Sequence, residues 1–215
     1  MKAKFILSFF IAVISFNHLF AQATITSNGL GGGNWSDGSV LGPWFPSGVP
    51  APGDIVIITA GDVVNADAAA TPVTCTAMEI YGTLIIDAGV TLTITGCNGE
   101  NIFGQNFTID GAAPGTLTNN GTFVLDQGAC GGAPSYENAA GGTFTNNNIL
   151  TLDNGADFLG NGTFVNTLTI NVNSTSGNSF FENFVSINNT GGTVNVNNGS
   201  TFFNAGSFGG GKRHH

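Results

Sequence analysis

Residues 142–146 read GTFTN, and the same pattern occurs at 115–119 (GTLTN) and 162–166 (GTFVN). Two looser copies end at Asn183 and Asn204, so that the final asparagines are separated by 27, 20, 17 and 21 residues. A period of about 20 residues is typical of a β-solenoid, in which each coil places its strands parallel on those of the next coil. We therefore predict that the corner asparagines stack into one ladder along the solenoid axis, formed by Asn119, Asn146, Asn166, Asn183 and Asn204.

The segments around these corners are short runs in which apolar and polar residues alternate, as at 83–87 (TLIID), 122–126 (TFVLD) and 193–197 (TVNVN). Alternation with a period of two predicts strands with one buried face, and no stretch after residue 21 has a helical apolar period. Six Asn-Gly dipeptides separate the runs. Since Asn-Gly also favours hairpins, a β-sandwich or a hairpin meander is the alternative fold. We prefer the solenoid because hairpins do not require the same corner residue at each period.

The narrow interior of such a coil leaves room for few large side chains. Phe123, Phe144 and Phe164 lie at comparable places in successive alternating runs. We predict that they point inward and stack on one another along the axis. Burial of each phenyl ring contributes about 1.5–3 kcal/mol.

The chain begins with a segment of different composition. Lys2 and Lys4 precede an apolar run at 5–14, and small residues at 21–23 (AQA) provide a cleavage site. This is the layout of a secretory signal peptide, and the apolar run is shorter than the roughly 20 residues of a membrane span. We predict a signal helix at 1–21 that is cleaved after Ala21 or Ala23, an N-terminal cap with the first strands at 22–60, solenoid coils at 61–205 and a flexible glycine-rich tail at 206–215.

The charge pattern excludes several classes of protein. The net charge is −9, and no Lys or Arg occurs between residues 5 and 211. A nucleic-acid binder needs such cations to neutralise phosphates, and most enzymatic mechanisms need a Lys, Arg or His that this region lacks apart from His18 in the leader. We expect a protein that is not an enzyme and has no cofactor, although loosely bound calcium is compatible with the oxygen-rich turns.

Three cysteines are present. Cys75 and Cys97 are 22 residues apart, which is close to one period, while Cys130 is a third and odd thiol. An exported protein can form a disulfide between Cys75 and Cys97 on adjacent coils, and the alternative is that all three are small buried residues.

The segment at 33–57 departs from the repeat. It contains GNWSD at 33–37, a second tryptophan at Trp44, GVP at 48–50 and PGDIVI at 52–57. It resembles a signature of secreted Bacteroidota surface proteins, in which Gly-Asn-Trp-Ser is followed by Val-Pro-x-x-Gly-Asp and by Asn-, Thr- and Gly-rich coils. This resemblance implies a right-handed parallel β-helix, export that often uses the type IX pathway, and an adhesin-like or surface-layer role. A sorting domain of that pathway is not recognisable here, which leaves the secretion route open. We expect Trp35 and Trp44 to cap the N-terminal end.

These observations predict a secreted, acidic, non-catalytic solenoid at the cell surface or in the extracellular matrix, with glycans or cell surfaces as partners. The alternative is a glycoside hydrolase that uses carboxylates alone, for which Asp62 with Asp67 or Asp153 with Asp157 are candidate pairs. We interpret these aspartates as turn residues. A lesser alternative is ice binding through outward Thr-x-Thr pairs, which occur at 91–95, 116–118, 143–145 and 167–169.

Overall fold

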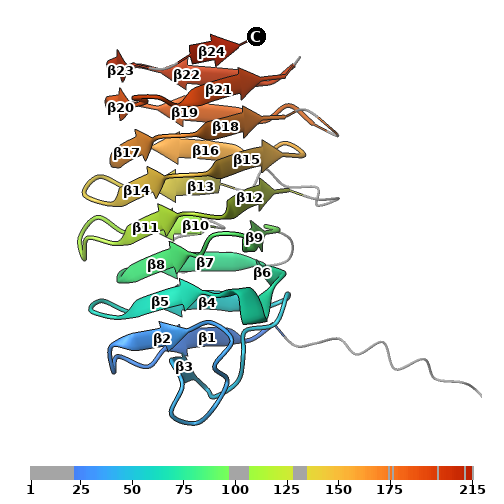
Figure 1. Ribbon diagram of the computed structural model, residues 1–215, viewed down its shortest axis with the longest axis vertical. Coiled ribbons are helices and arrows are strands. Elements are labelled where there is room, and N and C mark those ends of the chain that lie inside the picture. The colour runs from blue at the N-terminus through green and yellow to red at the C-terminus, as the bar shows by residue number, and fades with distance from the viewer. Residues whose placement is uncertain are drawn as a thin grey trace, which may run out of the picture.

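The computed structural model describes residues 22–96, 107–127, 135–173, 175, 177–197, 199–210 and 212–214. Three sheets run along the long axis of the molecule and enclose its core, and successive coils lie on top of one another from the N-terminal end to the C-terminal end (Figure 1). Among the strands that the structure describes, nearly all pairs are parallel, and the one antiparallel pair joins β1 (Thr24–Ser27) to β3 (Trp44–Phe45). The predicted β-solenoid is therefore confirmed. The predicted signal helix at 1–21 lies outside the described residues.

The first described coil contributes strands to sheets A and B, and each later coil passes through the sheets in the order A, B, C. Sheet A contains β1 (Thr24–Ser27), β3 (Trp44–Phe45), β4 (Ile55–Ile58), β7 (Ala77–Ile80), β10 (Phe107–Ile109), β13 (Ser135–Asn138), β16 (Asp157–Gly160), β19 (Phe180–Asn183) and β22 (Thr201–Asn204). Sheet B contains β2 (Gly32–Asn34), β5 (Val63–Ala66), β8 (Thr83–Ile86), β11 (Thr116–Asn119), β14 (Thr143–Asn146), β17 (Thr163–Asn166), β20 (Ile187–Asn188) and β23 (Phe208–Gly209).

Sheet C contains β6 (Val73–Cys75), β9 (Thr91–Ile94), β12 (Thr122–Asp126), β15 (Ile149–Asp153), β18 (Thr169–Val172), β21 (Thr193–Val196) and β24 (Lys212–His214). Within the described residues, the one helical segment is the short 3-10 turn η1 at Ala68–Ala70.

The coil is longer than the sequence repeat suggested, at about 23 residues instead of about 20. Thr143 pairs with Thr163, 20 positions later, in agreement with the repeat. Phe107, by contrast, pairs with Met78, 29 positions earlier, because a long connection separates β9 from β10. The period therefore varies in the connections, while the strands keep their register.

The alternating pattern places one face of most described strands in a continuous core. In β14, for example, Phe144 and Asn146 are buried while Thr143 and Thr145 are partly exposed. The ring centroids of Phe123 and Phe144 are 5.8 Å apart, and those of Phe144 and Phe164 are 4.8 Å apart. The predicted phenylalanine stack is thus confirmed, and its tilted and edge-to-face geometry is the one that aromatic pairs favour.

The Asn-Gly dipeptides act in two different ways. At Asn154 and Gly155 the φ angles are 55° and 90°, which is the left-handed conformation expected for a tight turn. Gly162 does not have a positive φ, but a Cβ there would lie 2.4 Å from the carbonyl oxygen of Ala139. At this second corner, glycine is required because consecutive coils approach closely.

The two ends of the solenoid differ in structure. At the N-terminal end, β3 pairs with β1 and lies beyond the first coil (Figure 1). At the other end, the predicted flexible tail at 206–215 is replaced in the structure by β23 and β24, which pair with β20 and β21. The backbone of a glycine-rich segment can therefore still join a sheet when a preceding coil offers it unpaired hydrogen-bonding groups.

Candidate functional site

The corner asparagines form two ladders, not the single ladder predicted. Asn119, Asn146 and Asn166 lie on neighbouring strands of sheet B and are fully buried. Each Nδ2 donates to the next Oδ1, over 2.7 Å from Asn119 to Asn146 and 2.7 Å from Asn146 to Asn166. Asn189 continues this ladder, since the Nδ2 of Asn166 donates to its Oδ1 over 2.6 Å.

Backbone groups form further hydrogen bonds with the sheet B ladder at its two ends and along its side. The backbone N–H of Gly121 donates to Asn119 Oδ1 over 3.1 Å, and Asn189 Nδ2 donates to the Gly192 carbonyl over 3.0 Å. Asn146 Nδ2 also lies 2.9 Å from the Thr169 carbonyl. The amides therefore bind the coils to one another and, at the same time, hold the sheet B–sheet C corner.

Asn183 and Asn204 belong to a separate column on sheet A, so their assignment to the first ladder was wrong. Asn183 Nδ2 donates to Asn204 Oδ1 over 2.8 Å. The register of this column runs from Asn138 through Gly160 to Asn183. The residues that precede Asn138 and Asn183 in this column are Ile109 and Gly160, which have no side-chain amide. The Oδ1 atoms of Asn138 and Asn183 are therefore buried without a hydrogen-bond partner in the described part of the chain.

Cys75 is a fully buried, free thiol. Its neighbour on the next coil is Ile94, whereas Cys97 and Cys130 lie outside the described residues. Burial, together with the negative charge of Asp54, raises the pKa of the Cys75 thiol. Cys75 is therefore a small buried residue of the core, which was the alternative to the disulfide.

We expect Cys75 to resist alkylation in the folded protein, because the reactive thiolate is both inaccessible and disfavoured. Iodoacetamide treatment followed by peptide mass spectrometry should find Cys75 unmodified under native conditions and fully modified in guanidinium chloride. Rapid modification of Cys75 at neutral pH without denaturant would contradict its burial.

Trp35 and Trp44 pack together at the N-terminal end of the core. Both side chains are buried, their ring centroids are 4.9 Å apart, and Trp44 Nε1 donates to the Trp35 carbonyl over 2.9 Å. The structure thus places these two residues where the sequence analysis expected the cap.

The aspartates proposed as hydrolase pairs serve the backbone. Asp62 accepts hydrogen bonds from the N–H groups of Gly29 and Gly31 over 2.9 and 2.8 Å. Asp67 accepts from the N–H and Oγ of Ser36 over 2.9 and 2.7 Å. These two carboxylates therefore connect the first coil to the second, and Asp54 makes a comparable bond of 3.2 Å with the N–H of Ala23.

The other candidate pair is divided between two sheets. Asp153 ends β15 in sheet C and accepts from the N–H of Asn154 over 2.9 Å, while Asp157 begins β16 in sheet A. No group of three or more His, Cys, Asp or Glu side chains that could hold a metal ion occurs among the described residues.

Acid should loosen the connection between the first two coils. Burial alone would raise the pKa of Asp62, but hydrogen bonds from Ser27, Thr59, Gly29 and Gly31 outweigh it and lower the pKa. The stabilisation that Asp62 contributes is therefore complete above the unfolded pKa of about 3.9 and is lost as pH falls through the lower folded pKa.

We expect Asp62→Asn to lower the melting temperature at pH 7, and to reduce the further decrease that the wild-type protein shows between pH 5 and pH 2. Differential scanning fluorimetry on both proteins measures this. An identical pH dependence in the variant would show that Asp62 does not carry the effect.

The predicted threonine pairs do not form one flat array. Thr116 with Thr118 and Thr143 with Thr145 point outward from sheet B, whereas Thr91 and Thr93 point outward from sheet C. Thr167 lies in a corner before β18. The outward faces of sheets B and C instead carry many hydroxyl and amide groups beside aliphatic and acidic side chains such as Val165, Ile149 and Asp153. Asn195 Nδ2, for example, donates to Asn171 Oδ1 over 2.9 Å.

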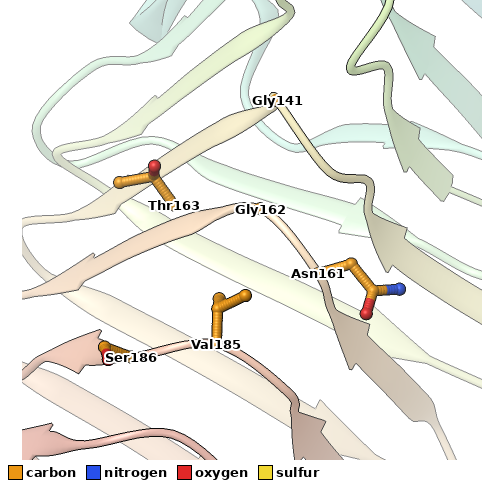
Figure 2. A pocket seen from close by; sticks show the side chains of 6 residues that line it. All are labelled: Gly141, Asn161, Gly162, Thr163, Val185 and Ser186. Atoms are coloured by element: carbon orange, nitrogen blue, oxygen red, sulfur yellow. The ribbon is translucent and has the colours of Figure 1, made fainter.

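An open hollow of about 230 Å³ lies where sheet A turns into sheet B. Asn161, Gly162 and Thr163 line it from one coil, and Val185 and Ser186 line it from the next, as Figure 2 shows. Gly141, from the preceding coil, also lines this hollow. No sequence pattern indicated this hollow, because its walls come from corners that are adjacent only in the folded coil.

Comparisons with known proteins found no match: no family model, no curated protein and no solved structure is similar to this chain at the level searched. No helix among the described residues has the length and apolar character needed to cross a membrane.

Proposed function

We propose that this protein is a secreted, acidic, non-catalytic solenoid of the cell surface or extracellular matrix, where it binds glycans or other surfaces passively, in the manner of an adhesin. The observation that carries the proposal is the distribution of its polar residues between the interior and the surface. The buried asparagines and several carboxylates hold the coils together, while many outward positions of sheets B and C carry hydroxyl or amide groups.

The sequence supports the same proposal in two ways. The signal peptide layout at 1–21 and the resemblance of the segment at 33–57 to secreted Bacteroidota surface proteins both favour an extracellular location. Asp54, Trp35 and Ser36 of that segment take part in the contacts of the N-terminal end, so the motif has a structural role in this chain.

The test uses the protein without residues 1–21 on glycan arrays and on whole bacterial cells, together with a hydrolysis screen on the same polysaccharides. We expect retention on at least one glycan or cell type and no release of reducing sugars. Turnover of a polysaccharide would replace this proposal by the hydrolase alternative, and the absence of any retention would reject the adhesive role.

A further inference from the structure

The outward face of sheet A changes character toward the C-terminal end. There, β16, β19 and the neighbouring corner carry large apolar side chains together with acidic ones on the outside. We call this surface the aromatic–acidic patch, and its members are Asp157, Leu159, Phe180, Glu182, Phe184 and Phe203. The exposed fractions of Phe180, Phe184 and Phe203 are 38%, 49% and 46%. Several exposed phenylalanines gathered on one surface are unusual for a monomeric protein and indicate a binding surface.

The strand register fixes how these side chains surround one acid. Phe180 and Phe184 lie two positions before and after Glu182, on the same outward side of the chain. On the adjacent strands, Glu182 pairs with Leu159 on one side and with Phe203 on the other. The rings of Phe184 and Phe203 are in contact, with centroids 6.1 Å apart and planes inclined at 61°.

A second acid and a hydrogen-bonding amide border the same surface. Burial and the charge of Glu182 raise the pKa of Asp157, in agreement with two carboxylates that share this face. On the corner side, Asn161 Nδ2 donates to Glu137 Oε1 over 3.0 Å, and Asn161 is also a wall of the hollow in Figure 2. The patch thus continues into the hollow, where Val185 and Ser186 directly follow Phe184 in the chain.

We propose that the aromatic–acidic patch and the adjoining hollow bind a neutral polysaccharide. This inference rests on the proposed function and gives it a place on the molecule. The C–H face of a sugar ring packs on Phe184 and Phe203, whose ring faces are electron-rich. Glu182 is an acceptor-only group when ionised, so it accepts hydrogen bonds from sugar hydroxyls beside those rings.

The charge of the chain selects among glycans. Since no Lys or Arg occurs between residues 5 and 211 and the net charge is −9, uronate-containing or sulfated chains meet only like charge at this surface. A neutral polysaccharide avoids this repulsion and supplies the hydroxyl donors that the carboxylates require.

The same acids oppose a second copy of the chain as the occupant. A two-fold contact through the patch would bury Glu182 and Asp157 of both copies at one interface, without a cation among the patch residues to pair with them. Burying unpaired carboxylates is costly, whereas a hydroxylated ligand provides hydrogen bonds at the moment of burial.

Affinity electrophoresis in native gels tests the proposal. The protein without residues 1–21 is run in gels that contain a neutral polysaccharide (hydroxyethylcellulose, laminarin or yeast mannan) or an acidic one (alginate or heparin). The variants are Phe184→Ser, Phe203→Ser and Glu182→Gln. The matched control is Leu168→Ser, because Leu168 is 46% exposed, as Phe203 is, but lies at the corner before β18. Circular dichroism confirms that each variant is folded.

We expect retardation by at least one neutral polysaccharide and by neither acidic one. Phe184→Ser and Phe203→Ser should weaken it up to about tenfold, as expected for loss of an aromatic contact of roughly 0.5–1.5 kcal/mol. Glu182→Gln should also weaken it, while Leu168→Ser should leave it unchanged.

Four other outcomes would overturn the inference. If the patch variants are retarded as much as the wild-type protein, the glycan binds elsewhere on the molecule and the proposed function is kept. Preference for alginate or heparin would contradict the charge argument. A concentration-dependent dimer in analytical ultracentrifugation, lost in Phe184→Ser, would identify the patch as a self-association surface. No binding to any glycan or cell would reject the proposed function as well.

Discussion

Replacing Asn146 by alanine should destabilise the protein by about 2–5 kcal/mol, because it interrupts the sheet B ladder in the middle. The Asn146 amide accepts from Asn119 and donates to Asn166 within the core, and it also donates to the partly buried Thr169 carbonyl. Without it, the buried Oδ1 of Asn166 loses its donor and the buried Nδ2 of Asn119 loses an acceptor. Each buried polar group left without a partner costs about 1–3 kcal/mol. The free energy of unfolding from urea titrations measures the change.

The adjacent Asn147 provides the control. Its Nδ2 donates to Asn120 Oδ1 over 3.0 Å between the same two coils, but this pair is exposed to solvent. Asn147→Ala should therefore change the free energy of unfolding by no more than about 0.5 kcal/mol. Equal effects of the two substitutions would show that burial of the ladder does not determine its contribution.

Replacing Phe181 by alanine should have an effect of about 3–5 kcal/mol, which is the usual cost of truncating a buried aromatic residue. Phe181 is fully buried and contacts rings from three strands. Its ring centroid is 4.9 Å from that of Phe158, 5.4 Å from that of Phe164 and 5.0 Å from that of Phe202. The substitution would therefore leave a cavity where strands of sheets A and B meet.

Phe180 precedes Phe181 on the same strand and points to the outside. Phe180→Ala removes the same number of atoms from a surface site, and we expect it to cost less than about 1 kcal/mol. The pair of substitutions, compared by thermal and urea unfolding, therefore tests the register of β19. A larger effect at Phe180 than at Phe181 would mean that the strand is shifted by one residue.

The sequence predicted those features of the fold that depend on repetition. Alternating runs identified the strands. The recurring corner at Asn119, Asn146 and Asn166 identified the solenoid, because a buried amide at this corner restricts which residue can occur there. The looser copies were assigned to the wrong ladder, since Asn183 and Asn204 end strands of sheet A, whose register includes Gly160 and not Asn166. The connection between strands carries no such constraint, and so the coil length was underestimated.

The surface features were less predictable for a different reason. The hollow and the aromatic–acidic patch combine residues such as Leu159, Glu182 and Phe203, which lie on three consecutive coils. No local pattern relates them, and their proximity depends on the exact number of residues between strands. The tail at 206–215 was misjudged because its glycines have low strand propensity, although the edges of β20 and β21 provide a template for it.

The 20-residue offset between β14 and β17 makes this part of the molecule modular. A tandem duplication of residues 143–162 would repeat Phe144 and Asn146 in the correct register, so that the inserted unit continues both the aromatic stack and the amide ladder. Each duplication would lengthen the solenoid by about 4.8 Å, the distance between neighbouring strands. Unequal recombination within such a gene could therefore adjust the length of the molecule without the need to evolve a new core.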